Sequence, residues 1–197
     1  MNFGKVGYLQ VLKRGKPIVI VTGPAGTGKT YIACREAKKN LKEKRYDRVI
    51  ITRPNVTCDE QLGYLPGTFQ DKLMPYLYPI FDNFDNYLKY KQQIEITPLS
   101  FIRGRTFKNS YIIADEMQNS TPNQMNTLLT RIGEDTRIVV TGDLQQSDLK
   151  IKNGLEDFIE RTEGKEYEYI DFVKLGKKDI KRHELIKEIC DIYNNED

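Results

Sequence analysis

The sequence contains one histidine, three cysteines and no tryptophan. Zinc sites are built from clustered Cys and His ligands, and with a single histidine and widely separated Cys34, Cys58 and Cys190 no such cluster can be assembled. An odd number of distant cysteines also gives no disulfide framework. The sequence therefore predicts reduced thiols without a zinc site.

Long apolar runs are also missing. The aliphatic run Ile18 to Val21 is far too short to span a membrane, and the N-terminus has no apolar stretch followed by a signal-peptide cleavage site. Low-complexity tracts and fixed-period repeats are absent as well. We expect a cytoplasmic protein that makes no membrane contact.

What is present fits one compact domain over residues 1–197, because 39% hydrophobic and 30% charged residues are typical of a soluble globular chain of this length. The net charge of +3 and pI of 8.6 are only mildly basic. A dedicated nucleic-acid-binding protein is usually more basic. Two lysine- and arginine-rich clusters, at residues 38–48 and 174–182, favour solvated helix ends over a phosphate track.

Short β-branched runs alternate with helical segments, which predicts parallel strands joined by helical crossovers in a three-layer α/β domain. The expected strands are Ile18 to Thr22, Val49 to Thr52, Tyr111 to Ala114, Arg137 to Thr141 and Tyr169 to Val173, with Ile94 to Pro98 as one more candidate. They are almost continuously apolar, as strands covered on both faces should be.

Two helices and an insertion can also be placed. Thr121, Pro122 and Gln124 form a start signal for a helix that we expect to stop at Gly133, and a last helix is expected from about Ile180 to Tyr193. Residues 54–93 are rich in turn residues and tyrosines and contain an amphipathic helical pattern. We interpret them as an inserted loop and helix region.

The most specific motif lies between the first expected strand and the following helical segment, and it matches the full P-loop pattern. Its residues are Gly23, Pro24, Ala25, Gly26, Thr27, Gly28, Lys29 and Thr30. In this pattern backbone N–H groups curl around the phosphates, the lysine reaches the β- and γ-phosphates, and the Thr hydroxyl ligates Mg²⁺. The motif predicts binding of ATP with Mg²⁺, through Lys29 and Thr30.

A second element is the apolar strand at Tyr111 to Ala114, which delivers Asp115 and Glu116 at its carboxyl end, where open α/β sheets bind ligands. We expect Asp115 to hold the Mg²⁺ shell, directly or through water. Glu116 is the candidate that orients and polarises an attacking water. This pairing favours ATP hydrolysis.

A third loop, Thr141 to Gln146, follows another strand at the same edge of the sheet. Either Gln146 or Asp143 is a candidate for sensing the γ-phosphate. Gly142-Asp143 taken alone is equally typical of a plain turn.

Taken together, these residues resemble the PhoH-like ATPases over roughly residues 17 to 193. The resemblance rests on Gly23 to Thr30 with Tyr31 and Ala33, Arg53-Pro54, Leu62 to Gly67, Pro98-Leu99, Arg103 to Thr106, Asp115 to Asn119, Leu129 to Arg131, and Thr141 to Leu149. It implies a P-loop NTPase of RecA-like fold, similar to the first motor domain of superfamily 1 helicases, with a mainly parallel sheet flanked by helices.

The resemblance also implies partners. It implies single-stranded RNA or DNA as a ligand and homo-oligomers such as a hexameric ring. A single motor domain lacks the arginine that a second domain gives to monomeric helicases, so an arginine finger must come from a neighbouring subunit or from within the domain. Arg131 and Arg182 are the candidates, and the sequence does not choose between them.

Two alternatives remain open from the residues alone: a nucleotide-gated oligomeric switch, and a P-loop kinase without nucleic-acid coupling. The choice between ATP and GTP is also open. Relatives often place a glutamine before the first strand to read adenine, and Gln10 is the nearest residue that fits.

Overall fold

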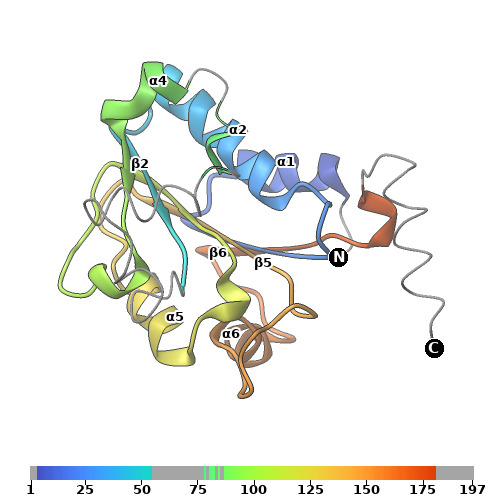
Figure 1. The fold of residues 1–197 in the computed structure, drawn as a ribbon. Coiled ribbons are helices and arrows are strands. Elements are labelled where there is room, and N and C mark those ends of the chain that lie inside the picture. Colours follow the sequence, from blue (N-terminus) through green and yellow to red (C-terminus); the bar gives the residue numbers. More distant parts are fainter. Residues whose placement is uncertain (1–3, 55–77, 79, 83, 85–86, 181–197) are drawn as a thin grey trace.

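The computed structural model describes residues 4–54, 78, 80–82, 84 and 87–180. These residues form an α/β domain (Figure 1). Its helices are α1 (Lys5–Lys13), α2 (Lys29–Lys42), α4 (Tyr87–Tyr90), α5 (Pro122–Leu129) and α6 (Gly154–Thr162), with short 3-10 turns η1 (Lys91–Gln93), η2 (Leu99–Phe101), η3 (Met117–Asn119) and η4 (Lys177–Asp179). Its strands are β1 (Ile18–Thr22), β2 (Arg48–Thr52), β3 (Ile94–Ile96), β4 (Ser110–Ala114), β5 (Arg137–Gly142) and β6 (Ile170–Lys174).

The strands form one sheet of six in the order β3-β2-β4-β5-β1-β6, and all its pairings are parallel. Strand β1 pairs Val19 with Val139 of β5 on one side and with Asp171 of β6 on the other. Because all strands run the same way, the loops that follow β1, β2, β4 and β5 meet at one edge of the sheet, its carboxyl edge.

Side chains alternate between the two faces of the sheet, and each face has its own core. Val19, Val49 and Ile113 face α1 and α2, whereas Ile20, Ile50 and Ile112 face α5 and α6. Figure 1 shows the same division, with α1, α2 and α4 on one side of the sheet and α5 and α6 on the other. The predicted three-layer α/β fold is confirmed.

The predicted strands agree with the structure to within one residue at most ends, and the candidate strand at Ile94 is β3. The predicted start of α5 is also confirmed, because Thr121 and Gln124 form a reciprocal capping box ahead of Pro122. Its predicted end at Gly133 is wrong. The helix ends at Leu129, and Ile132 instead pairs with Phe107 in a β-bridge that draws the chain out of the helix.

Helix α1 was not predicted. It is short, has a glycine in its interior and has no side-chain cap, so its local signals are weak. Tyr8, Val11 and Leu12 are nevertheless buried at helical spacing, and they belong to the core on the face of the sheet that α2 also covers. Packing on the sheet stabilises this helix more than its own sequence does.

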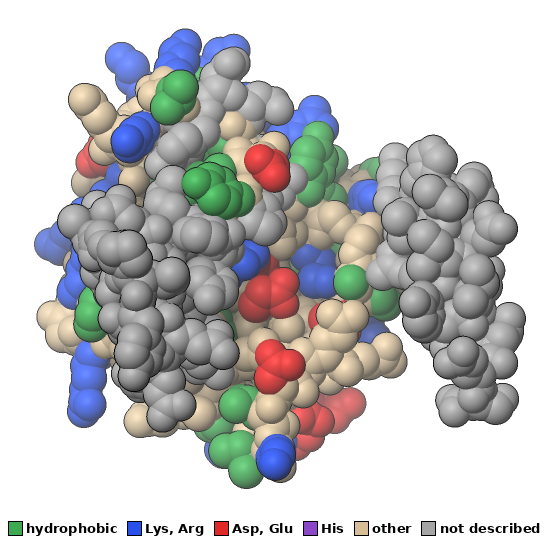
Figure 2. Space-filling model, viewed as in Figure 1, with side chains coloured by type: hydrophobic (Ala, Val, Ile, Leu, Met, Phe, Trp, Pro, Cys, Tyr) green, Lys and Arg blue, Asp and Glu red, His purple; other side chains and the backbone are tan. Residues whose placement is uncertain are grey.

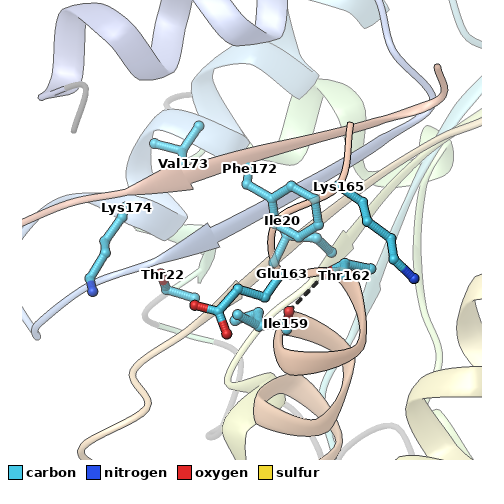
Figure 3. A pocket seen from close by; sticks show the side chains of 10 residues that line it. Ile20, Thr22, Ile159, Thr162, Glu163, Lys165, Phe172, Val173 and Lys174 are labelled. Carbon is cyan, nitrogen blue, oxygen red and sulfur yellow. Dashed lines mark hydrogen bonds between the residues drawn. The ribbon is translucent and has the colours of Figure 1, made fainter. Parts of the chain in front are cut away.

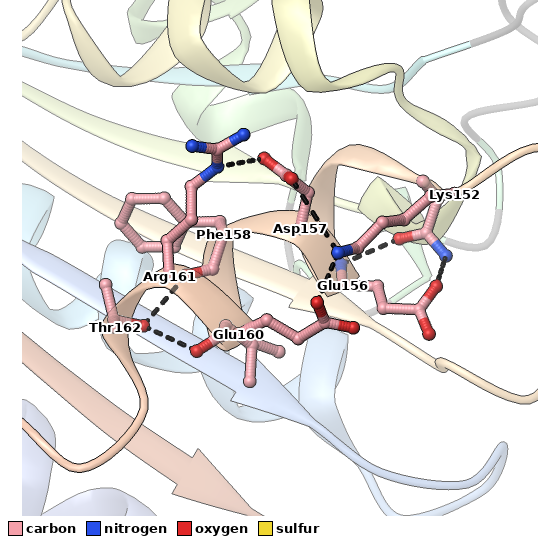
Figure 4. A network of polar contacts seen from close by, with 9 residues as sticks. Lys152, Glu156, Asp157, Phe158, Glu160, Arg161 and Thr162 are labelled. Atoms are coloured by element: carbon pink, nitrogen blue, oxygen red, sulfur yellow. Dashed lines mark hydrogen bonds and ion pairs between the residues drawn. The ribbon is translucent and has the colours of Figure 1, made fainter.

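Helix α6 is capped at its N-terminus and carries ion pairs on its exposed side (Figure 4). The Asn153 side chain accepts a hydrogen bond of 2.9 Å from the Glu156 N–H, which caps the helix. Arg161 pairs with Asp157 one turn away, and Lys152 pairs with Glu160.

Most of the expected insertion at 54–93 and the expected last helix lie outside the described residues. Of the insertion, Ile80, Phe81 and Phe84 are buried against the α2 side of the core, whereas Leu88 is 83% exposed. Lysine and arginine side chains gather at the top of Figure 2, where Figure 1 places α2 and α4. Lys39 and Lys42 of α2 are exposed. None of the helices that the structure describes combines the length and the apolar character needed to cross a membrane.

Candidate active site

The P-loop, Gly23 to Thr30, joins the carboxyl end of β1 to the first turn of α2. Gly28 is the N-cap of α2 and has a φ of 83°, a left-handed conformation that side chains disfavour. The loop therefore brings a row of backbone N–H groups to the positive end of a helix of 14 residues. This combination binds anions such as phosphate.

Lys29 lies inside this loop. Its Nζ donates hydrogen bonds to the carbonyl oxygens of Gly23 at 2.6 Å and Pro24 at 3.0 Å. Partial burial lowers the pKa of Lys29, and the negative charges of Asp143, Glu116 and Asp115 oppose that shift. A phosphate group would give this ammonium the charged partner that the loop carbonyls only partly replace.

Asp115 is buried at the carboxyl edge directly after β4, and it joins that strand to three other elements. Its Oδ1 accepts hydrogen bonds from the hydroxyls of Thr30 at 2.7 Å and Thr141 at 2.5 Å. Its Oδ2 accepts from Arg53, from Nε at 3.0 Å and from Nη2 at 2.5 Å. One carboxylate at the end of β4 thus forms hydrogen bonds to residues of α2 and β5 and to the residue that follows β2.

The same residues fit a magnesium ion. The Thr30 hydroxyl and the Asp115 carboxylate are hard oxygen ligands held next to each other beside the phosphate loop. Mg²⁺ is usually bound through one or two such protein oxygens, with water and substrate phosphates as its other ligands. The structure thus places both predicted metal ligands together.

Glu116 follows Asp115 and has φ 57° and ψ 36°, a left-handed conformation that costs a non-glycine residue about 1–3 kcal/mol. Its Oε2 accepts a hydrogen bond of 2.6 Å from the side-chain amide of Gln118. Acidic side chains lie beside basic ones near the middle of the face in Figure 2. Because Glu116 lies two residues after the end of β4, the candidate base is at the same edge of the sheet as the P-loop.

The loop after β5 touches the P-loop directly. The Asp143 carboxylate accepts hydrogen bonds of 3.1 Å from the Ala25 N–H and from the Gln145 N–H. Gln146 is exposed, and its backbone N–H donates to the Asp143 carbonyl at 3.0 Å. Of the two predicted γ-phosphate sensors, Asp143 contacts the P-loop, and Gln146 lies three residues later, in the turn that begins at Asp143.

One of the two arginine candidates, Arg131, is among the described residues. The Arg131 carbonyl accepts a hydrogen bond from the Phe107 N–H, which places Arg131 at the amino edge of the sheet, opposite the P-loop. The structure therefore does not bring it to the site of its own chain. Arg182 lies outside the described residues. Gln10 lies on the exposed side of α1, whose Tyr8 hydroxyl approaches the Lys29 carbonyl at 3.5 Å.

Two hollows adjoin these elements. One of about 300 Å³ opens beside the P-loop, between Pro24, Leu144 and Lys177. A second of about 400 Å³ lies between β6 and α6, where Phe172 and Ile159 form the apolar floor and Lys165 the rim (Figure 3). Only the first adjoins the predicted site residues.

Sequence reasoning missed the connecting side chains: Arg53 on Asp115, Thr141 on the same carboxylate, and Gln118 between Glu116 and Asp143. Each of these residues lies in one of the sequence motifs that carry the family resemblance, and this was the signal that could have identified them. Their partners are far away in the sequence, so their roles were not visible.

Comparison with known proteins gives concordant results. Residues 1–194 match the family described as PhoH-like protein. The chain is 38% identical to a PhoH-like protein of Bacillus subtilis, covering 99% of this chain and 63% of that protein. It is 38% identical to Protein PhoH of Escherichia coli, covering 98% of this chain and 57% of that protein. The chain thus spans less than two thirds of these relatives' length.

Among solved structures, a Pif1 helicase from Candida albicans superposes with a TM-score of 0.50 at 17% identity, covering 99% of this chain and 43% of that one. At this identity the likeness concerns the fold. It agrees with the parallel α/β sheet flanked by helices.

Proposed function

The chain belongs to the PhoH-like protein family, and from this premise we propose that it binds ATP together with Mg²⁺ and hydrolyses it to ADP and phosphate. The observation that carries the proposal is the Thr30 and Asp115 pair at 2.7 Å, beside the P-loop and directly before Glu116. It joins phosphate binding, a metal site and a candidate base within one sheet edge.

Each residue has a separate task in this reaction. The P-loop N–H groups and Lys29 bind the triphosphate, and Thr30 with Asp115 holds Mg²⁺, which when bound neutralises phosphate charge. Glu116 accepts a hydrogen bond from water and polarises it for attack on the γ-phosphorus. The bond between the γ-phosphorus and its bridging oxygen breaks, ADP leaves, and the proton of the water passes to the Glu116 carboxylate.

The first experiment measures steady-state hydrolysis of ATP and GTP with Mg²⁺ for the wild type, Glu116→Gln and the control Glu134→Gln, an exposed glutamate at the opposite edge. We expect Glu116→Gln to keep its nucleotide affinity and to lose about 10²- to 10⁴-fold in kcat, the usual contribution of a positioned base. Unchanged hydrolysis in Glu116→Gln would remove Glu116 as the base and favour the switch or the kinase alternative.

Single-stranded RNA or DNA is the partner we propose, supported by the family and by a fold similar to that of a Pif1 helicase. Hydrolysis and binding of labelled single strands are measured at two salt concentrations, because phosphate contacts weaken steeply with salt. Stimulation of hydrolysis by a strand supports the coupling. An ATPase indifferent to every strand tested argues for a nucleotide-gated switch.

The place of Arg131 supports a proposal about oligomerisation. Since it lies at the edge opposite its own P-loop, we propose that it acts in the site of a neighbouring subunit. Arg131→Ala and Glu116→Gln chains are each expected to be inactive, and a mixture of the two should regain hydrolysis at sites that combine an intact Arg131 with an intact Glu116. A mixture no more active than its components would contradict this arrangement, and light scattering gives the oligomer number.

A further inference from the structure

Gln118 is a buried side chain with two polar ends, both engaged with residues of the candidate active site. It is 2% exposed, and it lies in η3 directly after Glu116. Its amide nitrogen donates to the Glu116 carboxylate at 2.6 Å, and its amide oxygen accepts from the Asp143 N–H at 3.0 Å. One side chain thus spans the distance between the candidate base and the loop that contacts the P-loop.

The contact with Asp143 determines which way the amide faces. A buried backbone N–H requires an acceptor, and only the oxygen end of a glutamine amide can supply one. The NH₂ end must therefore point to Glu116, where it meets a carboxylate that accepts a hydrogen bond. The orientation follows from this donor and acceptor pairing.

The surroundings keep the amide in place. A Cβ added at Gly142 would lie 2.9 Å from the Gln118 amide oxygen and 2.4 Å from Leu155 Cδ2, so this close approach requires glycine. The Ser147 hydroxyl donates to the backbone carbonyl of Gln118 at 2.9 Å, and not to its side-chain amide. Asn119 and Asp148 exchange two further hydrogen bonds of 2.9 Å. The turn after β4 and the loop after β5 therefore form one connected unit.

We infer that Gln118 is a positioning residue for the proposed hydrolysis, which holds one oxygen of the Glu116 carboxylate so that the other faces the attacking water. A glutamate side chain has three rotatable bonds, and a base acts efficiently only when its oxygen is within hydrogen-bond reach of the proton it takes. Gln118 fixes that oxygen through a direct hydrogen bond. The inference rests on the proposed function.

Three variants separate this role from general support of the loop. Gln118→Met has a similar size and loses both hydrogen bonds. Gln118→Glu keeps an acceptor for the Asp143 N–H but has no donor for Glu116 and faces it with a like charge. Ser147→Ala is the matched control, because it loosens the same loop without touching Glu116.

The experiment measures kcat, nucleotide affinity and thermal unfolding for the wild type and these variants. We expect both Gln118 variants to lose about ten- to a hundredfold in kcat with nucleotide affinity changed less than twofold, because orientation of the base is impaired and phosphate binding is not. Ser147→Ala should stay within about threefold of the wild type. Adding Gln118→Met to Glu116→Gln should cost no further activity, since the group being positioned is already absent.

Equal kcat losses in Ser147→Ala and Gln118→Glu, or independent losses in the double variant, would overturn the inference. If the wild type shows no hydrolysis that depends on Glu116, the proposed function fails separately. A crystal structure of Gln118→Met then decides about Gln118: a Glu116 carboxylate displaced from its wild-type position supports the positioning role, and an unmoved carboxylate overturns it.

Discussion

At the scale of single residues, Asp115 is the most heavily bonded group of the site, and its ion pair with Arg53 is largely buried. The two side chains are 2% and 17% exposed, respectively. Without the arginine, the buried carboxylate would keep only the Thr30 and Thr141 hydroxyls as hydrogen-bond partners. Removal of one partner of such a pair typically costs more than the intact pair contributes.

We therefore predict that Arg53→Met lowers the free energy of unfolding by about 3–5 kcal/mol. Urea unfolding monitored by circular dichroism measures the change. Arg161→Met is the control, because Arg161 is 72% exposed in its pair with Asp157 and should matter little (Figure 4). Comparable small losses in both variants would show that Asp115 is adequately satisfied by Thr30 and Thr141 alone.

For Lys29 we predict a role in nucleotide binding rather than in stability. Burial disfavours its charged form and lowers its pKa. Lys29→Met should weaken nucleotide binding about ten- to a hundredfold, the equivalent of roughly 1.5–3 kcal/mol for a hydrogen bond to a charged group, without lowering the free energy of unfolding. Equilibrium titration with a fluorescent ATP analogue tests this, with the exposed Lys42→Met on the same helix as the control. Equal affinity of the two variants would contradict it.

At the scale of elements, α5 depends on its N-terminal cap. Thr121 accepts a hydrogen bond from the Gln124 N–H, and the Gln124 side chain accepts one from the Thr121 N–H. Thr121→Ala should cost about 1 kcal/mol of unfolding free energy, the usual value of such a cap. Thr130→Ala at the other end of α5 is exposed, and urea unfolding should separate the two. A larger loss at Thr130 would mean that the C-terminal turn is the more important end.

The edge strand β3 is joined to its neighbours by charge. Partial burial alone would raise the pKa of Glu95, but hydrogen bonds from Arg105 and Thr97 and the charges of Arg105 and Arg48 hold it below its usual range. A carboxyl group whose pKa is lower in the folded state stabilises the fold above its unfolded pKa of about 4.3, and this contribution is lost as pH falls through the folded pKa.

Glu95→Gln should therefore be less stable than the wild type near neutral pH, and the difference should shrink as the solution is acidified through and below that pKa. Unfolding free energies of both proteins at neutral and acidic pH give the two differences directly. An equal difference at both pH values would show that the carboxyl acts through packing instead of its charge.

At the scale of the whole molecule, nucleotide binding should stabilise the fold. A ligand that binds only the native state, present at 100 times its Kd, adds about 2.7 kcal/mol to the free energy of unfolding. We predict this gain for ATP with Mg²⁺ in the wild type and its loss in Lys29→Met at the same concentrations. Thermal unfolding with and without the nucleotide tests it, and equal gains in both proteins would place nucleotide binding away from the P-loop.

Local signals in the sequence were sufficient for much of this architecture. Buried parallel strands leave continuous apolar runs, and the P-loop and the capping box of α5 are defined by neighbouring residues. The contacts that assemble the site are of another kind, because Arg53 and Asp115 are 62 residues apart and Ala25 and Asp143 are 118 apart. Such contacts depend on the order of strands in the sheet, which no short window of sequence contains.

The place of β1 within the sheet has a consequence for synthesis of the chain. Both of its neighbours, β5 and β6, lie after residue 136 in the chain. Strand β1 therefore has no partner strand while more than one hundred later residues are synthesised. Pairings this distant in sequence form slowly, and domains fold as units during translation. The P-loop of a nascent chain is therefore synthesised early, but it lies on a paired strand only once β5 and β6 have left the ribosome. Nucleotide can stabilise the folding chain only from that moment.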